Sequence, residues 1–593
     1  MKPFLALRIA FLAVLAGLFL PGVRAATPQR PNVVLILIDD LSHYGVTAYG
    51  ADRLSCRSPR GPFENVRFQT PRMDQLAREG LLCDRAYVYP LCENTRVALM
   101  SGQNNNRNYL NCKIQHHSDI TFGDTFKRAG YATGIFGKWK QTRGTPTIPA
   151  ERYLYEFGWD EFACFDVVTE GQRYINPNLV INGEIHNYEG RTDIDPTTGR
   201  RWYGPDICNR AALEFIDRHK DEPFFLYYPM ILVHDEHQPT PDTEPREAFD
   251  NFQDAPHLGY GKRPDDPRYF PDMIEYADKL IGRIVDKIDQ LGLTENTLIV
   301  VMGDNGTKEI FTHILPDGST YPGRKGGTAD NGLHVPLILR QPGTIPAGKD
   351  GALRRYDGLI HVTDIYPTIA EAAGVEIPNR DAIDGISFWP QATGAPDEPR
   401  RYIHGWHNGN NPYTSRDTLI EFVFDKHFKR YAPDPHYPRG RLFDLRTDLF
   451  ERAGGEYVEL KWGVRKYRGL DLDHLTDEQR AAWERLGRLL EKHRHVPVKA
   501  LRIENAPTTL RVGETATIHC AVLPANATRR NIIWESDNPA VLDINKFGDL
   551  TARARGTATI HVYSWDDAWP QASGRAPEYR RDGITDAVTV TVE

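Results

Sequence analysis

The chain has little of three features that mark large classes of protein. After its first 25 residues, no apolar run is long enough to cross a membrane. No cluster of basic residues occurs, and the formal net charge is −8, so general affinity for nucleic acids is not expected. No internal repeat or low-complexity tract is present, which argues against a repeat array. An anionic substrate stays open, because a few lysines and arginines focused in a cleft outweigh the net charge locally.

Cysteine is also scarce, and its count is odd. Seven cysteines leave at least one without a disulfide partner inside the chain, and an unpaired thiol is a candidate for chemistry. An oxidising compartment permits disulfides, but the sequence does not determine their pairing. The spacings do not resemble those of a structural zinc site.

The N-terminal residues have the pattern of a cleaved export signal. Lys2 and Arg8 precede an apolar stretch at residues 9–20, and the short side chain of Ala25 suits cleavage after it. The alternative is a membrane anchor, but the stretch is short for a bilayer. We therefore expect a secreted or periplasmic protein with no membrane span, in which residues 1–25 are a signal peptide.

The length of 593 residues exceeds one compact core, so two or more domains are expected. Residues 32 to about 380 alternate strand-like runs with helical patterns, which is typical of a mostly parallel sheet with helices on both faces. Capping signals predict a helix over 70–80, and apolar residues at every third or fourth position predict another over 273–291. Further strands are predicted at 132–136, 224–228, 298–302 and 335–339.

Two smaller units are expected to follow. Residues 399–495 combine short runs typical of antiparallel strands with a helix predicted over 476–492. Residues 498–593 alternate β-forming residues with turn residues, as a β-sandwich does. The expected fold class is therefore α/β, with a mixed, mostly parallel central sheet flanked by helices over 26–398. A smaller antiparallel α+β subdomain and a β-sandwich domain complete it.

Two polar pairs follow two of the predicted strands. Asp39 and Asp40 end the first apolar strand, while Asp304 and Asn305 follow strand 298–302. In an open α/β sheet, ligands bind at the carboxyl ends of the strands. Four oxygen-bearing side chains at one such edge suggest a hard divalent cation, calcium above all. The alternative is that each pair caps a helix or forms a turn.

Further motifs occur in a fixed order along the chain. They are Cys92-x-x-x-Arg96 running into Leu99-Met100-Ser101-Gly102, Gly137-Lys138-Trp139, His234, and Lys325-Gly326-Gly327-Thr328 ahead of His334-Val335-Pro336. With the polar pairs, this order over about residues 31–455 resembles the type I sulfatases of the alkaline-phosphatase-like superfamily. The string Val512-Gly513-Glu514-Thr515 and its surroundings resemble a group 2 bacterial Ig-like domain.

The resemblance implies a sulfuric ester hydrolase in which Cys92 is oxidised to formylglycine (3-oxoalanine) by a formylglycine-generating or radical maturating enzyme. The hydrate of this aldehyde would attack sulfur, which needs a strong nucleophile and positive charge on the sulfate oxygens. The resemblance implies a calcium ion bound by an oxygen of residue 92 and by Asp39, Asp40, Asp304 and Asn305. For Cys92 the alternative is a structural cysteine or half of a disulfide.

The same resemblance implies roles for other residues. Arg96 would hold the modified residue, for which a planar guanidinium is suited. Lys138 and Lys325 would bind the sulfate oxygens, unless they are ordinary surface lysines. His234, with His237 as the neighbouring alternative, would protonate the leaving alcohol.

Two sites depart from the family pattern. Asn94 and Thr95 stand where proline and serine or alanine are usual, which bears on recognition by the modifying enzyme. Lys140 stands where the family commonly has a histidine that takes a proton as sulfate leaves. An ammonium group is a donor, so either positive neighbours depress the pKa of Lys140 or another residue takes the proton, with His116 and His117 as candidates.

The sequence thus predicts a secreted enzyme that removes sulfate from a sulfated glycan, since an exported catalytic domain with an Ig-like tail suits a polymeric substrate. Two alternatives stay open. A phosphodiester or phosphonate monoester hydrolase of the same superfamily would share nearly every residue named. A glycan-binding protein without activity would result if Cys92 stayed unmodified.

Overall fold

The computed structural model describes residues 30–108, 115–141, 148–168, 171–252, 264–408, 419–460, 464–566 and 580–593. The expected signal peptide and Cys112 lie outside these ranges. The six cysteines within them are all unpaired. None of the helices in these ranges has the length and apolar character needed to cross a membrane.

A sheet of eleven strands forms the centre of the molecule, and its four middle strands are parallel. In spatial order these are β12 (Thr297–Gly303), β1 (Asn32–Ile38), β11 (Phe224–Pro229) and β5 (Ala132–Lys138). On the β5 side, parallel β6 (Glu161–Phe165) is followed by antiparallel β7 (Asn178–Ile181) and β8 (Glu184–Asn187). On the β12 side, β15 (His334–Arg340) pairs antiparallel with both β12 and β4 (Leu81–Tyr87), and β16 (Arg355–Tyr356) and β17 (Ile360–His361) pair in parallel with β4. This confirms the expected mixed sheet.

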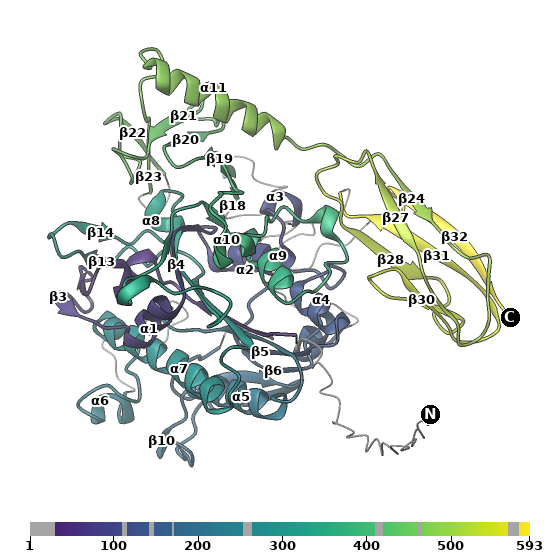
Figure 1. Ribbon diagram of the computed structural model, residues 1–593, viewed down its shortest axis with the longest axis horizontal. Coiled ribbons are helices and arrows are strands. Elements are labelled where there is room, and N and C mark those ends of the chain that lie inside the picture. The colour runs from purple at the N-terminus through teal and green to yellow at the C-terminus, as the bar shows by residue number, and fades with distance from the viewer. Residues whose placement is uncertain are drawn as a thin grey trace, which may run out of the picture.

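Helices cover both faces of the sheet (Figure 1). Side chains of successive strand residues point to opposite faces, so Val34 and Ile36 pack in one core and Val33 and Leu35 in the other. The first core includes residues of α1 (Pro71–Glu79), α5 (Gly204–Arg218) and α7 (Phe270–Gln290). The second includes residues of α2 (Cys92–Ser101), α4 (Phe122–Arg128) and α9 (Ile365–Ala372). The helices expected over 70–80 and 273–291 are therefore confirmed as α1 and α7.

A small antiparallel sheet lies at the edge of this unit. It is formed by β2 (Arg53–Cys56), β3 (Phe63–Arg67), β13 (Phe311–Ile314) and β14 (Thr320–Pro322). The chain then runs through a short loop into α8 (Asp330–Leu333).

The smaller subdomain has the antiparallel strands that the sequence predicts. Its sheet consists of β18 (Ile403–Asn408), β19 (Leu419–Phe424), β20 (Phe428–Tyr431) and β21 (Arg441–Asp444), with the hairpin β22 (Tyr457–Leu460) and β23 (Val464–Tyr467) beside it in sequence. α11 (Asp477–Lys492) follows. It begins at Thr476, whose side chain accepts from the Gln479 N–H while Gln479 bonds back to Thr476.

The last unit is the expected β-sandwich. Its strands are β24 (Ala500–Glu504), β25 (Thr509–Leu510), β26 (Thr515–Thr517), β27 (His519–Leu523), β28 (Ile532–Ser536), β29 (Leu542–Ile544), β30 (Asp549–Ala552), β31 (Gly556–Ser564) and β32 (Thr585–Val592). The sandwich lies against the α/β unit (Figure 1), where the Trp565 indole donates to Ser118 Oγ at 3.0 Å and Arg128 pairs with Asp549. It is therefore docked on the first unit rather than only tethered to it.

Lys546 of the sandwich makes several polar contacts across this interface. Its ammonium group lies 2.9 Å from the Asp124 carboxylate and donates to the carbonyl oxygens of Asp119 at 3.0 Å and Glu156 at 2.5 Å. One charged donor thus joins the sandwich to three separate residues of the α/β unit.

We expect Lys546→Ala to destabilise the docked protein by about 1.5–3 kcal/mol, because it leaves these acceptors without their charged donor. With an unfolding entropy of about 2.1 cal/mol/K per residue over 593 residues, the midpoint of thermal unfolding should fall by roughly 1–2.5 °C, measured by scanning calorimetry. Lys499→Ala, at an exposed position of the same sandwich, should leave the midpoint unchanged. Equal midpoints for the two variants would show that Lys546 does not stabilise the interface.

Candidate active site

The two polar pairs meet at the carboxyl edge of the parallel strands. Asp39 and Asp40 follow β1, and Asp304 and Asn305 follow β12, which pairs with β1 in parallel register. The Asp40 N–H donates to Asp304 Oδ1 at 3.0 Å, and Asn305 Nδ2 donates to Asp40 Oδ1 at 2.8 Å. All four side chains are buried, and the parallel pairing of β1 with β12 brings these four oxygen-bearing groups together.

Residue 92 lies directly beside this acidic cluster. Cys92 is the first residue of α2, so it lies where the helix dipole favours negative charge. Its Sγ atom and one carboxylate oxygen each of Asp39 and Asp304 lie within 4.8 Å of one another. Burial, and next the Glu93 carboxylate, raise the pKa of Cys92 to about 12, which keeps the thiol protonated in this setting.

Two of the predicted cations connect residue 92 to the cluster. Arg96 follows Cys92 by four residues in the helix and therefore shares its face. Its guanidinium lies 2.9 Å from Asp304 Oδ2 and 3.5 Å from Asp39 Oδ2. Lys138 Nζ lies 2.5 Å from Asp39 Oδ2 and 3.5 Å from Cys92 Sγ.

The residue before Lys138 is a glycine that allows β5 to pass very close to β11. Gly137 has φ +136°, and a Cβ atom there would lie 2.0 Å from the carbonyl oxygen of Pro229 on β11. Only glycine allows this close approach and this backbone conformation. Gly137 therefore allows Lys138, at the end of β5, to place its ammonium group beside Asp39.

The other two predicted residues reach the cluster from loops. Lys325 Nζ lies 2.6 Å from Asp40 Oδ2. His234 Nε2 lies 3.9 Å from the same oxygen, and its Nδ1 lies 2.9 Å from Asp235 Oδ1. Burial, and then the charges of Lys325 and Lys138, lower the pKa of His234. The neighbouring His237 instead pairs with Asp265 at 2.9 Å and packs edge-on against Phe270 and Phe311, so His234 is the histidine that faces the cluster.

The cluster fits a dication. Asp39 Oδ1 and Asn305 Oδ1 are buried, and neither has a hydrogen-bond partner among the described residues. Burial and then the Asp39 carboxylate raise the pKa of Asp304 to about 7, whereas burial of Asp39 is outweighed by Lys138, His234 and Arg96, which lower its pKa. Two oxygens without donors and crowded carboxylates are what a hard cation would satisfy.

Of the two alternatives for Lys140, its surroundings favour the one in which another residue takes the proton. Its ammonium group lies 3.5 Å from Glu93 Oε1. Although burial acts to lower the pKa of Lys140, the nearby carboxylates of Glu93 and Asp166 help to raise it above its usual value, so the group stays charged. His116 and His117, the other candidates, make their contacts with Ser118, Trp565 and Tyr153, on the side of the Ig-like sandwich.

Sequence reasoning missed three groups that hold the site. Glu93 accepts a hydrogen bond from Cys92 Sγ at 3.1 Å, Asp235 pairs with His234, and Arg173 Nη1 lies 3.3 Å from His234 Nδ1. Glu93 and Asp235 each follow a predicted site residue directly, and this adjacency is the signal that could have found them. Arg173 carries no such signal, because it comes from a distant loop.

We expect Ca²⁺ to raise the midpoint of thermal unfolding, since a ligand at about a hundred times its Kd stabilises the folded state by about 2.7 kcal/mol. Asn305→Leu removes one oxygen without a donor and should reduce the Ca²⁺-induced rise, measured by scanning calorimetry with and without EDTA. Asn538→Leu, at an exposed position of the sandwich, should keep the full rise. A midpoint of thermal unfolding that changes with neither Ca²⁺ nor EDTA would contradict the expectation that the acidic cluster binds Ca²⁺.

Comparisons with known proteins agree with this geometry. The sulfatase family matches residues 31–375, and a group 2 bacterial Ig-like domain matches residues 497–569. The N-acetylgalactosamine-6-sulfatase of Canis lupus familiaris is 27% identical over 406 residues, covering 64% of this chain and 70% of that protein. The N-acetylgalactosamine-6-O-sulfatase of Bacteroides thetaiotaomicron is 26% identical over 445 residues (63% and 79%), and a sulfatase of Formosa agariphila is 24% identical over 565 residues (79% and 92%).

Solved structures share the fold. The PsFucS1 sulfatase from Pseudoalteromonas sp. superposes with a TM-score of 0.54 at 20% identity, covering 78% of this chain and 90% of that one. A structure solved with its substrate D-glucosamine-2-N,6-O-disulfate gives 0.55 at 19% identity (78% and 97%). With the family matched over residues 31–375 of 593, the chain belongs to the sulfatase family and is a sulfuric ester hydrolase.

Proposed function

We propose that this sulfatase removes sulfate from a sulfated carbohydrate, with residue 92 as formylglycine and a calcium ion in the cluster of Asp39, Asp40, Asp304 and Asn305. The observation that carries the proposal is the position of Cys92 Sγ, 3.5 Å from Lys138 Nζ and beside the two strand-end carboxylates. In the formylglycine form, an oxygen atom replaces this sulfur. A formylglycine-generating or radical maturating enzyme would act on the chain before it folds and is exported.

Each absent group has a defined part in this proposal. The hydrate of formylglycine would supply the oxygen nucleophile for sulfur, and the calcium ion would supply Lewis-acid polarisation of the sulfate. The donor set fits the ion, because it consists of carboxylate and amide oxygens. All further steps would use side chains of this chain.

Cationic side chains orient the ester and stabilise its charge. Lys138 ends β5 and Lys325 lies in the loop after β14, and each ammonium group lies beside an aspartate of the cluster. A sulfate ester entering the cluster would accept hydrogen bonds from both, which is the stabilisation that anionic transition states need. Arg96, fully buried, holds the carboxylates and the helix start in register through a planar fork.

His234 would protonate the leaving alcohol. Asp235 and Arg173 hold its Nδ1 side, which leaves Nε2 directed at the cluster. The approach of a sulfate anion would offset the positive charges of Lys325 and Lys138 that lower the pKa of the imidazole. Asp235 therefore orients the acid, and His234 would donate the proton.

The carbohydrate part of the proposal is supported by the relatives. Two of them are named for N-acetylgalactosamine sulfate groups, and one structural neighbour was solved with a sulfated glucosamine. Export, with residues 1–25 as its signal, would place the enzyme outside the cytoplasm, where polymeric glycans occur.

We expect Cys92→Ala to lower sulfate release by at least about a thousandfold, because the nucleophile and its flanking groups act as one unit. Release should be measured by ion chromatography on a sulfated oligosaccharide and, in parallel, on the corresponding phosphate ester. Cys520→Ala, a half-buried cysteine of the sandwich, is the matched control and should keep the wild-type rate. Full turnover by Cys92→Ala would contradict the proposal, and faster release of phosphate than sulfate would favour phosphoester hydrolysis.

The role of His234 makes a separate prediction that depends on the leaving group. His234→Ala should slow hydrolysis of an alkyl or sugar sulfate by about 10²–10⁴-fold, the usual contribution of a general acid. It should slow hydrolysis of 4-nitrophenyl sulfate by less than about tenfold, because nitrophenolate leaves without a proton.

The control is His427→Ala, an exposed histidine of the smaller subdomain, which should change neither rate. An equal loss on both esters would show that His234 binds or orients the substrate instead of protonating the alcohol.

A further inference from the structure

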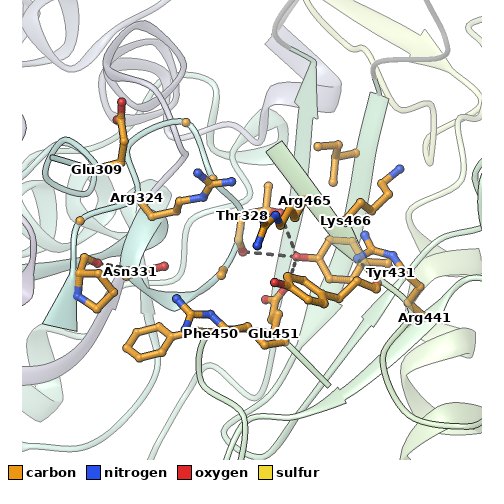
Figure 2. Close-up of a pocket in the computed structure, with 18 of the residues that line it drawn as sticks. Glu309, Arg324, Thr328, Asn331, Tyr431, Arg441, Phe450, Glu451, Arg465 and Lys466 are labelled. Atoms are coloured by element: carbon orange, nitrogen blue, oxygen red, sulfur yellow. Dashed lines mark hydrogen bonds between the residues drawn. The ribbon is translucent and has the colours of Figure 1, made fainter. Parts of the chain in front are cut away.

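A groove of about 560 Å³ lies between the loop that carries Lys325 and the smaller subdomain (Figure 2). One wall is the chain from Pro322 to Asn331, and the other comes from β20, β21, the turn at 450–452 and β23. None of the predicted catalytic or metal-binding residues lines it. The groove is therefore a separate feature from the active site, although the two share a loop.

Positive charge dominates the groove. Six cationic side chains line it against two carboxylates, Glu309 and Glu451; the cations are Arg57, Arg324, Arg441, Arg452, Arg465 and Lys466. Glu451 is already neutralised, since it lies 2.7 Å from Lys429 Nζ and accepts from the Tyr431 hydroxyl. In a chain of net charge −8, such a concentration is a local anion-attracting field.

Several of these cations have no anion of their own. Within the described ranges, Arg324, Arg452 and Arg465 form no ion pair. Arg452 and Arg465 are exposed, and each lies over an aromatic ring, of Phe450 and Tyr457 respectively. Their charged ends are available to a ligand in the groove, as Figure 2 shows for the labelled Arg465 and Arg324.

Arg441 is a buried cation that lines the groove. It is 5% exposed, and its guanidinium carbon lies 3.9 Å from the centre of the Tyr431 ring. Its Nη1 donates to the Tyr467 carbonyl oxygen, but its Nε is buried and has no partner among the described residues. A buried N–H donor without an acceptor is costly unless a ligand or water satisfies it.

The groove is joined to the catalytic site through one short loop. Arg324 lines the groove, and the next residue, Lys325, directs its ammonium group to Asp40. Gly326 lines the groove again, and its N–H donates to the Pro90 carbonyl oxygen, two residues before Cys92. A chain molecule lying along this loop would have one anionic group at residue 92 and another in the groove.

We propose that the groove binds a second anionic group, a sulfate or a carboxylate, of a polyanionic glycan whose scissile ester lies at residue 92. The inference rests on the proposed function for the scissile ester, but the groove's own evidence is independent of it. Guanidinium groups bind sulfate and carboxylate oxygens in pairs, and the partly exposed ring of Phe450 offers a flat apolar surface for a sugar ring. The preferred substrate is accordingly multiply charged.

The test is binding of the full-length protein to dextran sulfate, to polygalacturonate and to neutral dextran, measured by surface plasmon resonance at constant salt. The wild-type protein should bind one or both polyanions and not dextran, and the preferred polyanion identifies sulfate or carboxylate as the ligand. Arg452→Glu/Arg465→Glu should weaken that binding by at least about tenfold, since two charged contacts are reversed.

The matched control is Arg78→Glu/Arg553→Glu, which makes the same change in net charge at exposed positions of α1 and of the sandwich. It should bind as the wild type does. Equal binding by the groove variant and the wild type, an equal loss in the control, or no polyanion binding by the wild type would overturn the proposal.

Sulfate release from 4-nitrophenyl sulfate by the same wild-type preparation separates this result from the proposed function. If sulfate is released but the groove variant binds polyanions as tightly as the wild type does, the groove does not bind the second anion and the proposed function still holds. If no ester is hydrolysed, the proposed function fails, and the binding data still decide whether the groove takes anions. If the protein hydrolyses the ester and the groove binds anions, dextran sulfate should inhibit hydrolysis, with an inhibition constant about tenfold higher in the groove variant.

Discussion

Buried carboxylates at one edge of a parallel sheet are the constraint on which the rest of this structure depends. Asp39, Asp40 and Asp304 are taken out of water at the ends of β1 and β12, and buried charges of one sign are costly unless they are compensated. Compensation comes from Lys138 and Lys325, and from a guanidinium of α2. Those cations can serve a sulfate ester because the carboxylates have already brought them together.

The same arrangement explains the features around the cluster. Residue 92 starts the helix that carries Arg96, so one helix positions both residue 92 and the guanidinium that pairs with Asp304. The loop of Lys325 closes the cluster on one side and forms the wall of the cationic groove on the other. The Ig-like sandwich is docked beside α3 (Asn105–Asn108) and α4, where Arg107 donates to the Thr528 carbonyl oxygen and Arg128 pairs with Asp549. It is therefore part of a continuous body with the catalytic unit.

The sequence predicted the parts of this site that follow from strand periodicity. Apolar runs end at Asp39 and Asp304, and parallel neighbours must bring their ends to one edge, so the cluster could be foreseen. Lys325 and His234 lie on loops, whose paths have no period, and only the family resemblance indicated them. The charged state of Lys140 could not be foreseen, because it depends on the contact with Glu93. The cationic groove forms where the smaller subdomain packs against the loop of Lys325. No local sequence pattern predicts that packing.

The central claim is that residue 92 is an aldehyde in the active enzyme, placed where the carboxylates and cations converge. The most direct test is the mass of the tryptic peptide of residues 86–96, taken from exported protein whose sulfate release has been measured. The account predicts that oxygen replaces the sulfur of Cys92, in proportion to the specific activity of each preparation. An intact thiol throughout a preparation that releases sulfate at full rate would contradict it.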